Sequence, residues 1–310
     1  MRDQLDHLPQ SVQRELAHVV RVLFEEFDAA LRPGTSKWSK QGRIFKVMLY
    51  GSFARGDWVS DPVGGYFSDY DILIVVNDER LADFEFWSPT EDRLMRDVTI
   101  NKALTAPVSF IVHSLTDVNA QLERGRPFFI DLVEQGIALY EAEGFEFAAP
   151  RILPPEEALA EARKHFDHWF ALAEQSDRTF ELQNAEGNSG TWRNDAAFTL
   201  HQATERLYHC ALLVLTLYSP KSHRLNFLRS QCEQIAPLLT QGWPRATKFE
   251  RRCFELLRQA YVNARYSSHY AITDKELAWL GERVAILLGL VGSVCRSHLG
   301  ERVSGDAHDR

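Results

Sequence analysis

The sequence predicts an α+β protein in two parts, a mixed sheet with helices followed by an all-α bundle. Short apolar runs that suit buried strands alternate with amphipathic helical patterns as far as about Gly144. After Pro150, every periodic segment has the spacing of a helix. We therefore expect a first domain at residues 1–148, a second at 149–300 and a flexible tail at 301–310.

In the first part, apolar residues at helical spacing predict a helix from Pro9 to Leu31. The residues from Ser88 to Glu91 are typical of a capping box with proline at the first helical position, so a helix should run from there to about Leu104. A strand at 69–76 is apolar on both faces after Asp71, which predicts a central place in the sheet. The other expected elements are strands at 43–50, 108–112 and 137–140, and a helix at 115–123.

The second part is expected to be a helical bundle. Helical patterns cover residues 156–173, 197–218 and 249–260, with a polar loop at 186–190. A last helix begins at a capping box, Thr273 to Glu276, and its apolar residues follow in alternating steps of three and four.

The composition is that of an acidic globular protein. The chain has 310 residues and a formal net charge of -8. An acidic chain does not attract phosphate backbones, so a long nucleic acid is not an expected partner. The four cysteines, Cys210, Cys232, Cys253 and Cys295, lie in apolar helical patterns, as free thiols do in a reducing compartment. We find no apolar signal core and no apolar run near ~18 residues, so we expect a cytoplasmic protein without membrane contact.

One ordered set of residues carries candidate chemistry. The strand that ends at Tyr50 leads into Gly51 and Ser52, where a glycine lets backbone approach a ligand and a turn N–H suits a phosphate. Asp69 and Asp71 are two apart on a strand, so both side chains point to one face. Two carboxylates so close repel each other unless a cation lies between them, and oxygen ligands suit Mg²⁺. The pattern predicts a metal site beside a phosphate-binding turn.

These residues resemble a known family. Gly51-Ser52-x-x-Arg55-Gly56 followed by Ser68-Asp69-x-Asp71 is similar to the signature of the minimal nucleotidyltransferases, which share the polymerase-β fold and include the aminoglycoside nucleotidyltransferases. The helical half resembles a HEPN domain in three stretches, at 197–205, 221–225 and 264–266. The resemblance implies a polymerase-β-like nucleotidyltransferase domain fused to a HEPN-like helical bundle.

The resemblance also implies roles for individual residues. Asp69 and Asp71 would be the catalytic residues and would hold magnesium, with two ions possible. Ser52 would bind the phosphates of a nucleoside triphosphate, and Arg55 would support the phosphate loop. Gly51 and Ser68 complete the nucleotide-binding set.

Three departures from these families stand out. Sixteen residues separate Ser52 from Asp69, which indicates a longer loop over the site. Ser109 stands on the third strand where the family usually has a third carboxylate, which helps to activate the acceptor hydroxyl. HEPN ribonucleases typically carry an Arg and a His four to six residues apart, whereas Arg265 and His269 have three residues between them.

The helical half offers groups that could replace the missing acid. His201, Glu205 and His209 recur every four residues on one helix, as a metal site or, more commonly, as a solvated or interdomain face. We expect the active site in a cleft between the domains, with at least one of four groups facing Asp69 and Asp71: His201, Glu205, His223 or His269. The stretch from Arg265 to Tyr270 suits either base stacking or a turn, and the basic residues from Arg245 to Arg252 suit a solvated surface.

The favoured function is Mg²⁺-dependent transfer of a nucleoside monophosphate from an NTP to a hydroxyl, with release of pyrophosphate. The acceptor would be a small molecule or a protein side chain. Two alternatives stay open: a HEPN-type ribonuclease or toxin-antitoxin-like protein, and a nucleotide-binding sensor without turnover. A homo-oligomer is compatible with the sequence.

Overall fold

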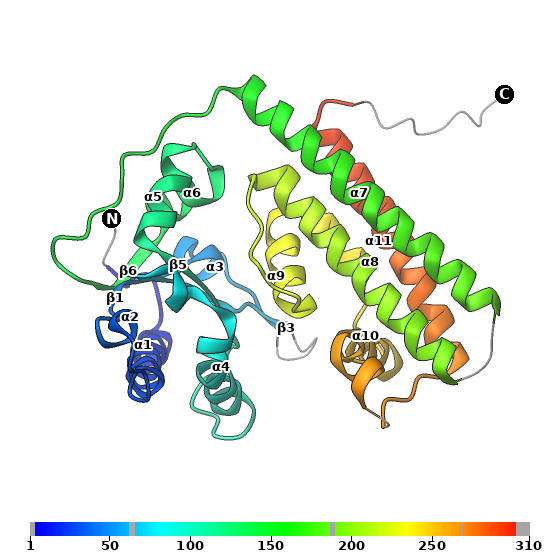
Figure 1. The fold of residues 1–310 in the computed structure, drawn as a ribbon, viewed down its shortest axis with the longest axis horizontal. Coiled ribbons are helices and arrows are strands. Elements are labelled where there is room, and N and C mark those ends of the chain that lie inside the picture. Colours follow the sequence, from blue (N-terminus) through cyan, green and yellow to red (C-terminus); the bar gives the residue numbers. More distant parts are fainter. Residues whose placement is uncertain (1–3, 62–65, 187–189, 268, 302–310) are drawn as a thin grey trace. The chain divides into compact units, whose positions relative to one another are not determined.

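The computed structural model describes residues 4–61, 66–186, 190–267 and 269–301 (Figure 1). The chain divides into two compact units, and the boundary in the sequence lies between Leu153 and Pro154. We call residues 4–153 the sheet unit and residues 154–301 the helical unit. Most of the polar loop expected at 186–190 and of the tail expected at 301–310 lies outside the described residues.

The sheet unit contains a four-stranded mixed sheet. Its strands lie in the order β5-β4-β1-β6, with β4 parallel to β5 and antiparallel to β1, and β1 antiparallel to β6. Every residue of β4 is buried, so the central place that its apolar run predicts is confirmed. The bounds are β1 Ile44–Tyr50, β4 Tyr70–Val76, β5 Val108–Ser114 and β6 Ile137–Glu141.

Helices cover both faces of this sheet. In Figure 1, α1 (Gln10–Leu31) and α4 (Phe84–Thr99) lie on one side of the sheet, and α5 (Leu115–Glu123) and α6 (Pro127–Gln135) lie on the other. Alternate residues of β4 divide between the two layers: Ile72 and Ile74 join the core under α1, and Leu73 faces the other way. The short elements are α2 Lys37–Lys40, α3 Gly51–Arg55, β2 Ser60–Asp61, β3 Tyr66–Phe67 and a 3₁₀ turn, η1, at Glu79–Ala82.

The start predicted for α4 was wrong. The helix begins at Phe84, where Asp83 caps it by accepting a hydrogen bond from the Glu85 N–H at 2.9 Å. Pro89 therefore lies inside the helix rather than at its first position. The earlier start places Trp87 in the core, where its Nε1–H donates to the Leu81 carbonyl at 2.6 Å. Burial of Trp87 stabilises the longer helix more than the missing Pro89 N–H destabilises it. A local capping pattern does not include such a contact.

The helical unit is built around α8. This helix packs against α7, α9, α10 and α11, and α7 and α8 run side by side over most of their length (Figure 1). The sequence patterns predicted four of the five helices but not α9. The bounds are α7 Pro155–Glu186, α8 Gly190–Thr216, α9 Leu225–Ile235, a 3₁₀ segment η2 Pro237–Gly242, α10 Lys248–Tyr266 and α11 Asp274–His298.

The capping box of the last helix is confirmed. The Thr273 hydroxyl accepts from the Glu276 N–H, and the Glu276 carboxylate accepts from the Thr273 N–H at 2.9 Å. By length and composition α11 could also span a membrane, with a mean hydropathy of 1.6 over its apolar window. The expectation that no such run exists was therefore wrong. The core helix of a bundle has the same composition, and α11 packs closely on α7, since a Cβ atom at Gly281 would lie 2.5 Å from the Phe180 ring.

All four cysteines are free and buried. Burial raises the pKa of Cys232 well above its ordinary value, so its thiol stays protonated. This agrees with the expectation that they pack as small apolar side chains.

Candidate functional site

The Gly-Ser turn and the Asp pair lie at the same edge of the sheet. Tyr50, the last residue of β1, pairs with Asp71 at the start of β4. The chain then enters α3 directly at Gly51, whose φ of +71° is in the left-handed region that favours glycine. The turn is thus held beside Asp71 by the antiparallel pairing of two buried strands. Neither strand has any exposed residue, which makes this edge rigid.

Ser109 lies next to the Asp pair, at the place where the resemblance to the nucleotidyltransferases predicts a third acid. It is the register partner of Asp71 across the parallel β4–β5 pair. The Ser109 hydroxyl donates to Asp69 Oδ2 at 2.8 Å. Asp71 is fully buried, and Asp69 is partly exposed. Ser109 therefore orients a carboxylate and adds no negative charge of its own.

Ser52 and Ser68 differ in how their hydroxyls are used. Ser52 is buried on α3, and its hydroxyl has no hydrogen-bond partner among the residues that the structure describes. The Ser68 hydroxyl accepts from the Val59 N–H at 2.9 Å, and the Ser68 N–H donates to the Val59 carbonyl. Ser68 thus fixes the loop before Asp69, whereas Ser52 keeps its full capacity for a ligand.

Arg55 lies at the end of α3 between carboxylates. Its Nε is 3.3 Å from Asp57 Oδ2, and both side chains are well exposed. Desolvation raises the pKa of Asp131 on α6, and so does the neighbouring Glu134, while the Arg55 guanidinium opposes that rise. The α6 helix also packs on the site strand, because Phe128 meets Tyr50 edge to face at 5.7 Å. Arg55 is therefore balanced by protein carboxylates on the surface.

The Asp pair fits a magnesium ion by its chemistry. The described residues contain no group of three or more His, Cys, Asp or Glu side chains arranged to hold a metal. Mg²⁺ often takes only one or two carboxylates and completes its shell with water and substrate phosphates. Asp69 and Asp71 match that pattern, with Ser109 as a hydrogen-bond partner behind Asp69.

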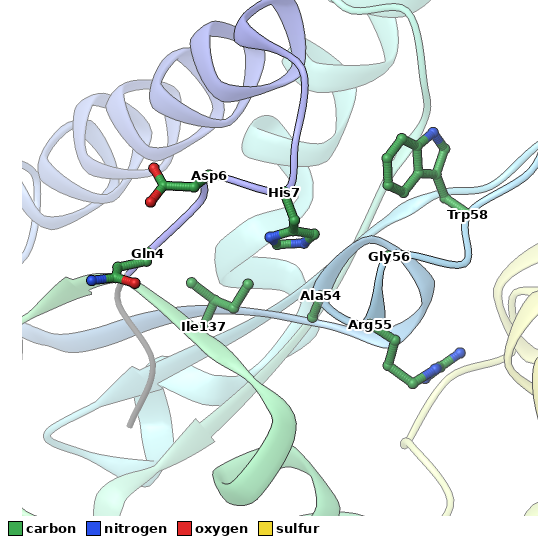
Figure 2. A pocket seen from close by; sticks show the side chains of 8 residues that line it. All are labelled: Gln4, Asp6, His7, Ala54, Arg55, Gly56, Trp58 and Ile137. Carbon is green, nitrogen blue, oxygen red and sulfur yellow. The ribbon is translucent and has the colours of Figure 1, made fainter.

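A pocket of about 580 Å³ lies at the other end of α3. Figure 2 shows Gln4, Asp6 and His7, which precede α1, opposite the Ala54–Gly56 end of α3. His7 Nε2 lies 2.9 Å from the Phe53 carbonyl, which ties this segment to α3. The lining residues are Gln4, Asp6, His7, Ala54, Arg55, Gly56, Trp58 and Ile137. Asp69 and Asp71 do not line this pocket, so it is separate from the Asp pair.

The helical unit holds a second polar cluster, which we call the Glu205 cluster: His201, Glu205, His209 and His223. All three histidine side chains of this cluster face the Glu205 carboxylate. Glu205 Oε1 lies 2.9 Å from His223 Nδ1 and 3.8 Å from His209 Nε2, and Oε2 lies 3.6 Å from His201 Nε2. The three α8 residues are largely buried, so the expectation of a solvated face was wrong, whereas the interdomain alternative stays a prediction.

Burial and charge oppose each other in this cluster. Desolvation raises the pKa of Glu205, but the facing His201 and His223 lower it more, so the carboxylate stays ionised. Desolvation lowers the pKa of His209, and this effect exceeds the opposing effect of Glu205. His209 is therefore neutral near pH 7.

The remaining predicted groups play smaller roles. His269 is exposed, and the side chains of Arg265 and Tyr266 lie outside the described residues. Two residues of the basic cluster form ion pairs: Arg245 binds Glu233 at 2.7 Å and Arg252 binds Glu276 at 2.7 Å. That His201, Glu205, His223 or His269 completes the Asp69 and Asp71 site stays a prediction.

Comparison with known proteins identifies part of the helical unit. Residues 171–292 match the family model described as HEPN domain. The match begins within α7, ends within α11 and includes the whole Glu205 cluster. No curated protein matches the chain. The chain thus combines an α+β sheet unit, outside this match, with a C-terminal helical HEPN region.

Proposed function

We propose that the sheet unit is a nucleotidyltransferase that moves a nucleoside monophosphate from an NTP to a hydroxyl acceptor and releases pyrophosphate. The observation that carries this proposal is the pairing of Tyr50 with Asp71, which brings the Gly51 turn and both Asp carboxylates to one sheet edge. The resemblance of these residues to the minimal nucleotidyltransferases supports it. Mg²⁺ and the NTP would be the cofactor and substrate.

Each residue has a role that its surroundings support. The left-handed Gly51 lets a phosphate approach the backbone, and the buried Ser52 hydroxyl is available to donate to a phosphate oxygen. Asp69 and Asp71 would hold magnesium, which offsets charge on the triphosphate when it is bound. Ser109 keeps Asp69 in position through its 2.8 Å hydrogen bond. A hydroxyl group stays protonated near neutral pH, so Ser109 does not serve as the base.

The test is loss of transfer in charge-neutral variants. We expect Asp69→Asn and Asp71→Asn each to lower Mg²⁺-dependent pyrophosphate release by at least about 100-fold, the usual scale for removing a key electrostatic group. Asp78→Asn is the matched control, since Asp78 lies beyond the other end of β4 and pairs with Arg80 at 2.6 Å. Near wild-type release by both site variants would overturn the assignment.

A second candidate function is RNA cleavage by the helical unit. The HEPN match at residues 171–292 favours it. The short spacing of Arg265 and His269 departs from the pattern typical of HEPN ribonucleases. RNA cleavage that persists in the Asp69→Asn and Asp71→Asn variants would assign this activity to the helical unit.

A further inference from the structure

The exposed His223 has one ring nitrogen, Nε2, without a hydrogen-bond partner among the described residues, and the other, Nδ1, is fixed. Its side chain is 61% exposed, whereas the side chain of Glu205 is 15% exposed. A carboxylate can only accept, so His223 Nδ1 carries the hydrogen that bridges the 2.9 Å to Glu205 Oε1. The neutral ring then has its lone pair on Nε2. A buried acid that sets the tautomer of an exposed imidazole is the arrangement that general bases use.

His201 and His209 face the Glu205 carboxylate from the same helix, at distances longer than a hydrogen bond. His201 Nδ1 lies 3.0 Å from the Leu257 carbonyl, so it donates there, and its Nε2 faces Glu205 Oε2. His209 Nδ1 is 2.6 Å from the Ser219 hydroxyl, and its Nε2 faces Glu205 Oε1. Two imidazoles with fixed rings therefore flank the carboxylate, one turn before it and one turn after it on α8.

The loop that carries His223 is also fixed. Leu217, directly after α8, has a φ of +54°, and Ser219 ties the loop back to His209. The His223 ring stacks on Tyr261 of α10 at 4.8 Å with an interplanar angle of 12°. Contacts from α8 and α10 thus hold the imidazole before any substrate arrives, as a catalytic base requires.

We propose that His223 is the general base of an RNA-cleaving site in the helical unit, with Glu205 as its positioning residue. This inference rests on the second candidate function. His223 Nε2 would take the proton from a ribose 2′-hydroxyl, and the 2′-oxygen would form a bond to the adjacent phosphorus. The bond from phosphorus to the 5′-oxygen breaks, and that oxygen takes a proton from water. The products are a 2′,3′-cyclic phosphate and a 5′-hydroxyl.

The surroundings suit a phosphodiester. Lys221 is exposed two residues from His223 and can offset charge on the phosphate. Residues 154–310 contain 19 Lys and Arg and 19 Asp and Glu, so the net charge of -8 lies in residues 1–153 and not in the helical unit. His269 lacks the support that His223 has, since its ring has no hydrogen-bond partner among the described residues. The geometry therefore favours His223 over His269.

The experiment uses the full-length protein and a DNA oligomer that contains a single ribonucleotide. EDTA is added so that chemistry at Asp69 and Asp71 does not contribute. We expect wild type to cleave only after the ribonucleotide and to leave a cyclic phosphate. His223→Gln should lower the rate by about 100-fold or more, the scale of general-base catalysis. His269→Gln, the matched control, should cleave within about twofold of wild type.

Glu205→Gln separates positioning from simple structural support. It should lower the rate and also move the acidic limb of the pH-rate profile, because the carboxylate no longer stabilises the imidazolium. The other titratable groups around Glu205 and His223 are His201 and His209 on α8, Tyr261 on α10 and Lys221 beside His223. Melting temperatures of all variants check their folding.

The outcomes distinguish the assignment of His223 as the base from RNA cleavage by the helical unit. Cleavage lost in His269→Gln but retained in His223→Gln would overturn the His223 assignment and leave RNA cleavage standing. An unmoved pH profile in Glu205→Gln would overturn the positioning role. No cleavage of the single-ribonucleotide oligomer or of a fully RNA oligomer of the same sequence would overturn RNA cleavage itself.

Discussion

The two units differ in how their polar groups are arranged. At the sheet edge, the Ser52 hydroxyl is buried without a partner among the described residues, and Asp69 directly precedes β4, two residues before the buried Asp71. In the Glu205 cluster, three imidazoles face one carboxylate and His223 donates to it, with Leu257, Ser219 and Tyr261 as outer supports, while the buried His201 Nε2 has no hydrogen-bond partner among the described residues. Unsatisfied buried polarity costs stability and points to an absent ligand, whereas satisfied polarity supports the fold.

Stability should therefore respond differently to neutralising an acid in each place. We expect Glu205→Ala to lower the free energy of unfolding by about 2 kcal/mol, because three imidazoles lose their common carboxylate. Asp69→Asn should change it by less than about 0.5 kcal/mol, because the amide oxygen can still accept from Ser109. Calorimetry that resolves the two units measures both variants, since a chain with two units need not unfold in one step.

An equal loss of stability in the two variants would remove the distinction between a ligand site and a supporting cluster. Glu205→Gln is the matched control, because it keeps the size of the side chain and an acceptor for His223. It should lose less than Glu205→Ala.

The pH dependence of stability sharpens the same comparison. Burial lowers the pKa of His209, so the unfolded chain binds its proton more readily than the folded chain. The contribution of His209 is thus fully present above about pH 6.5, the ordinary value, and is lost as the pH falls toward the lower folded pKa. Glu205 also has a lowered pKa, so its contribution is lost only at more acid pH, below about 4.5.

We expect the free energy of unfolding of the helical unit to fall between pH 7.5 and 5.5. His209→Asn should reduce that fall, since its amide can keep the Ser219 contact without titrating. His168→Asn, on the exposed side of α7, is the control and should leave the slope unchanged. Equal slopes in wild type and His209→Asn would show that His209 does not carry this dependence.

Local patterns predicted most of the fold and the sheet-edge motif. The buried strands and the capping box at Thr273 follow from apolar spacing and from side chains within four residues. The start of α4 could not be predicted in this way, because Trp87 selects it through tertiary packing. The α9 helix was missed as well, since its charged Arg229 and Glu233 pair at 2.6 Å inside the unit.

The candidate sites also differ in how far local sequence patterns predict them. Asp69 and Asp71 are two residues apart at the start of a strand, so their proximity could be predicted from the sequence alone. The four-residue spacing of His201, Glu205 and His209 also predicts neighbours on one helix. Burial of this face, and the return of His223 to Glu205, depend on how the loop after Leu217 packs. Pair distances of that kind are set by tertiary packing, which local sequence patterns do not reveal.

The test with the smallest expected effect is the most direct, because the same substitution, serine to alanine, is made in both units. Ser52 and Ser176 are 5% and 4% exposed. The Ser52 hydroxyl has no partner among the described residues, whereas the Ser176 hydroxyl donates to the Leu172 carbonyl at 3.2 Å and accepts from Arg206. Ser176→Ala removes a satisfied group and leaves Arg206 short of a partner, so it should cost about 1 kcal/mol.

Ser52→Ala removes an unsatisfied buried hydroxyl, so the free energy of unfolding should stay level or rise by up to about 1 kcal/mol. The same variant should weaken NTP binding by less than about tenfold, because one neutral hydrogen bond is lost while the backbone N–H remains. Calorimetric unfolding and NTP titration measure the two effects on the same samples. If Ser52→Ala destabilises the protein as much as Ser176→Ala does, the hydroxyl supports the fold. Its proposed role at a phosphate would then lose its structural basis.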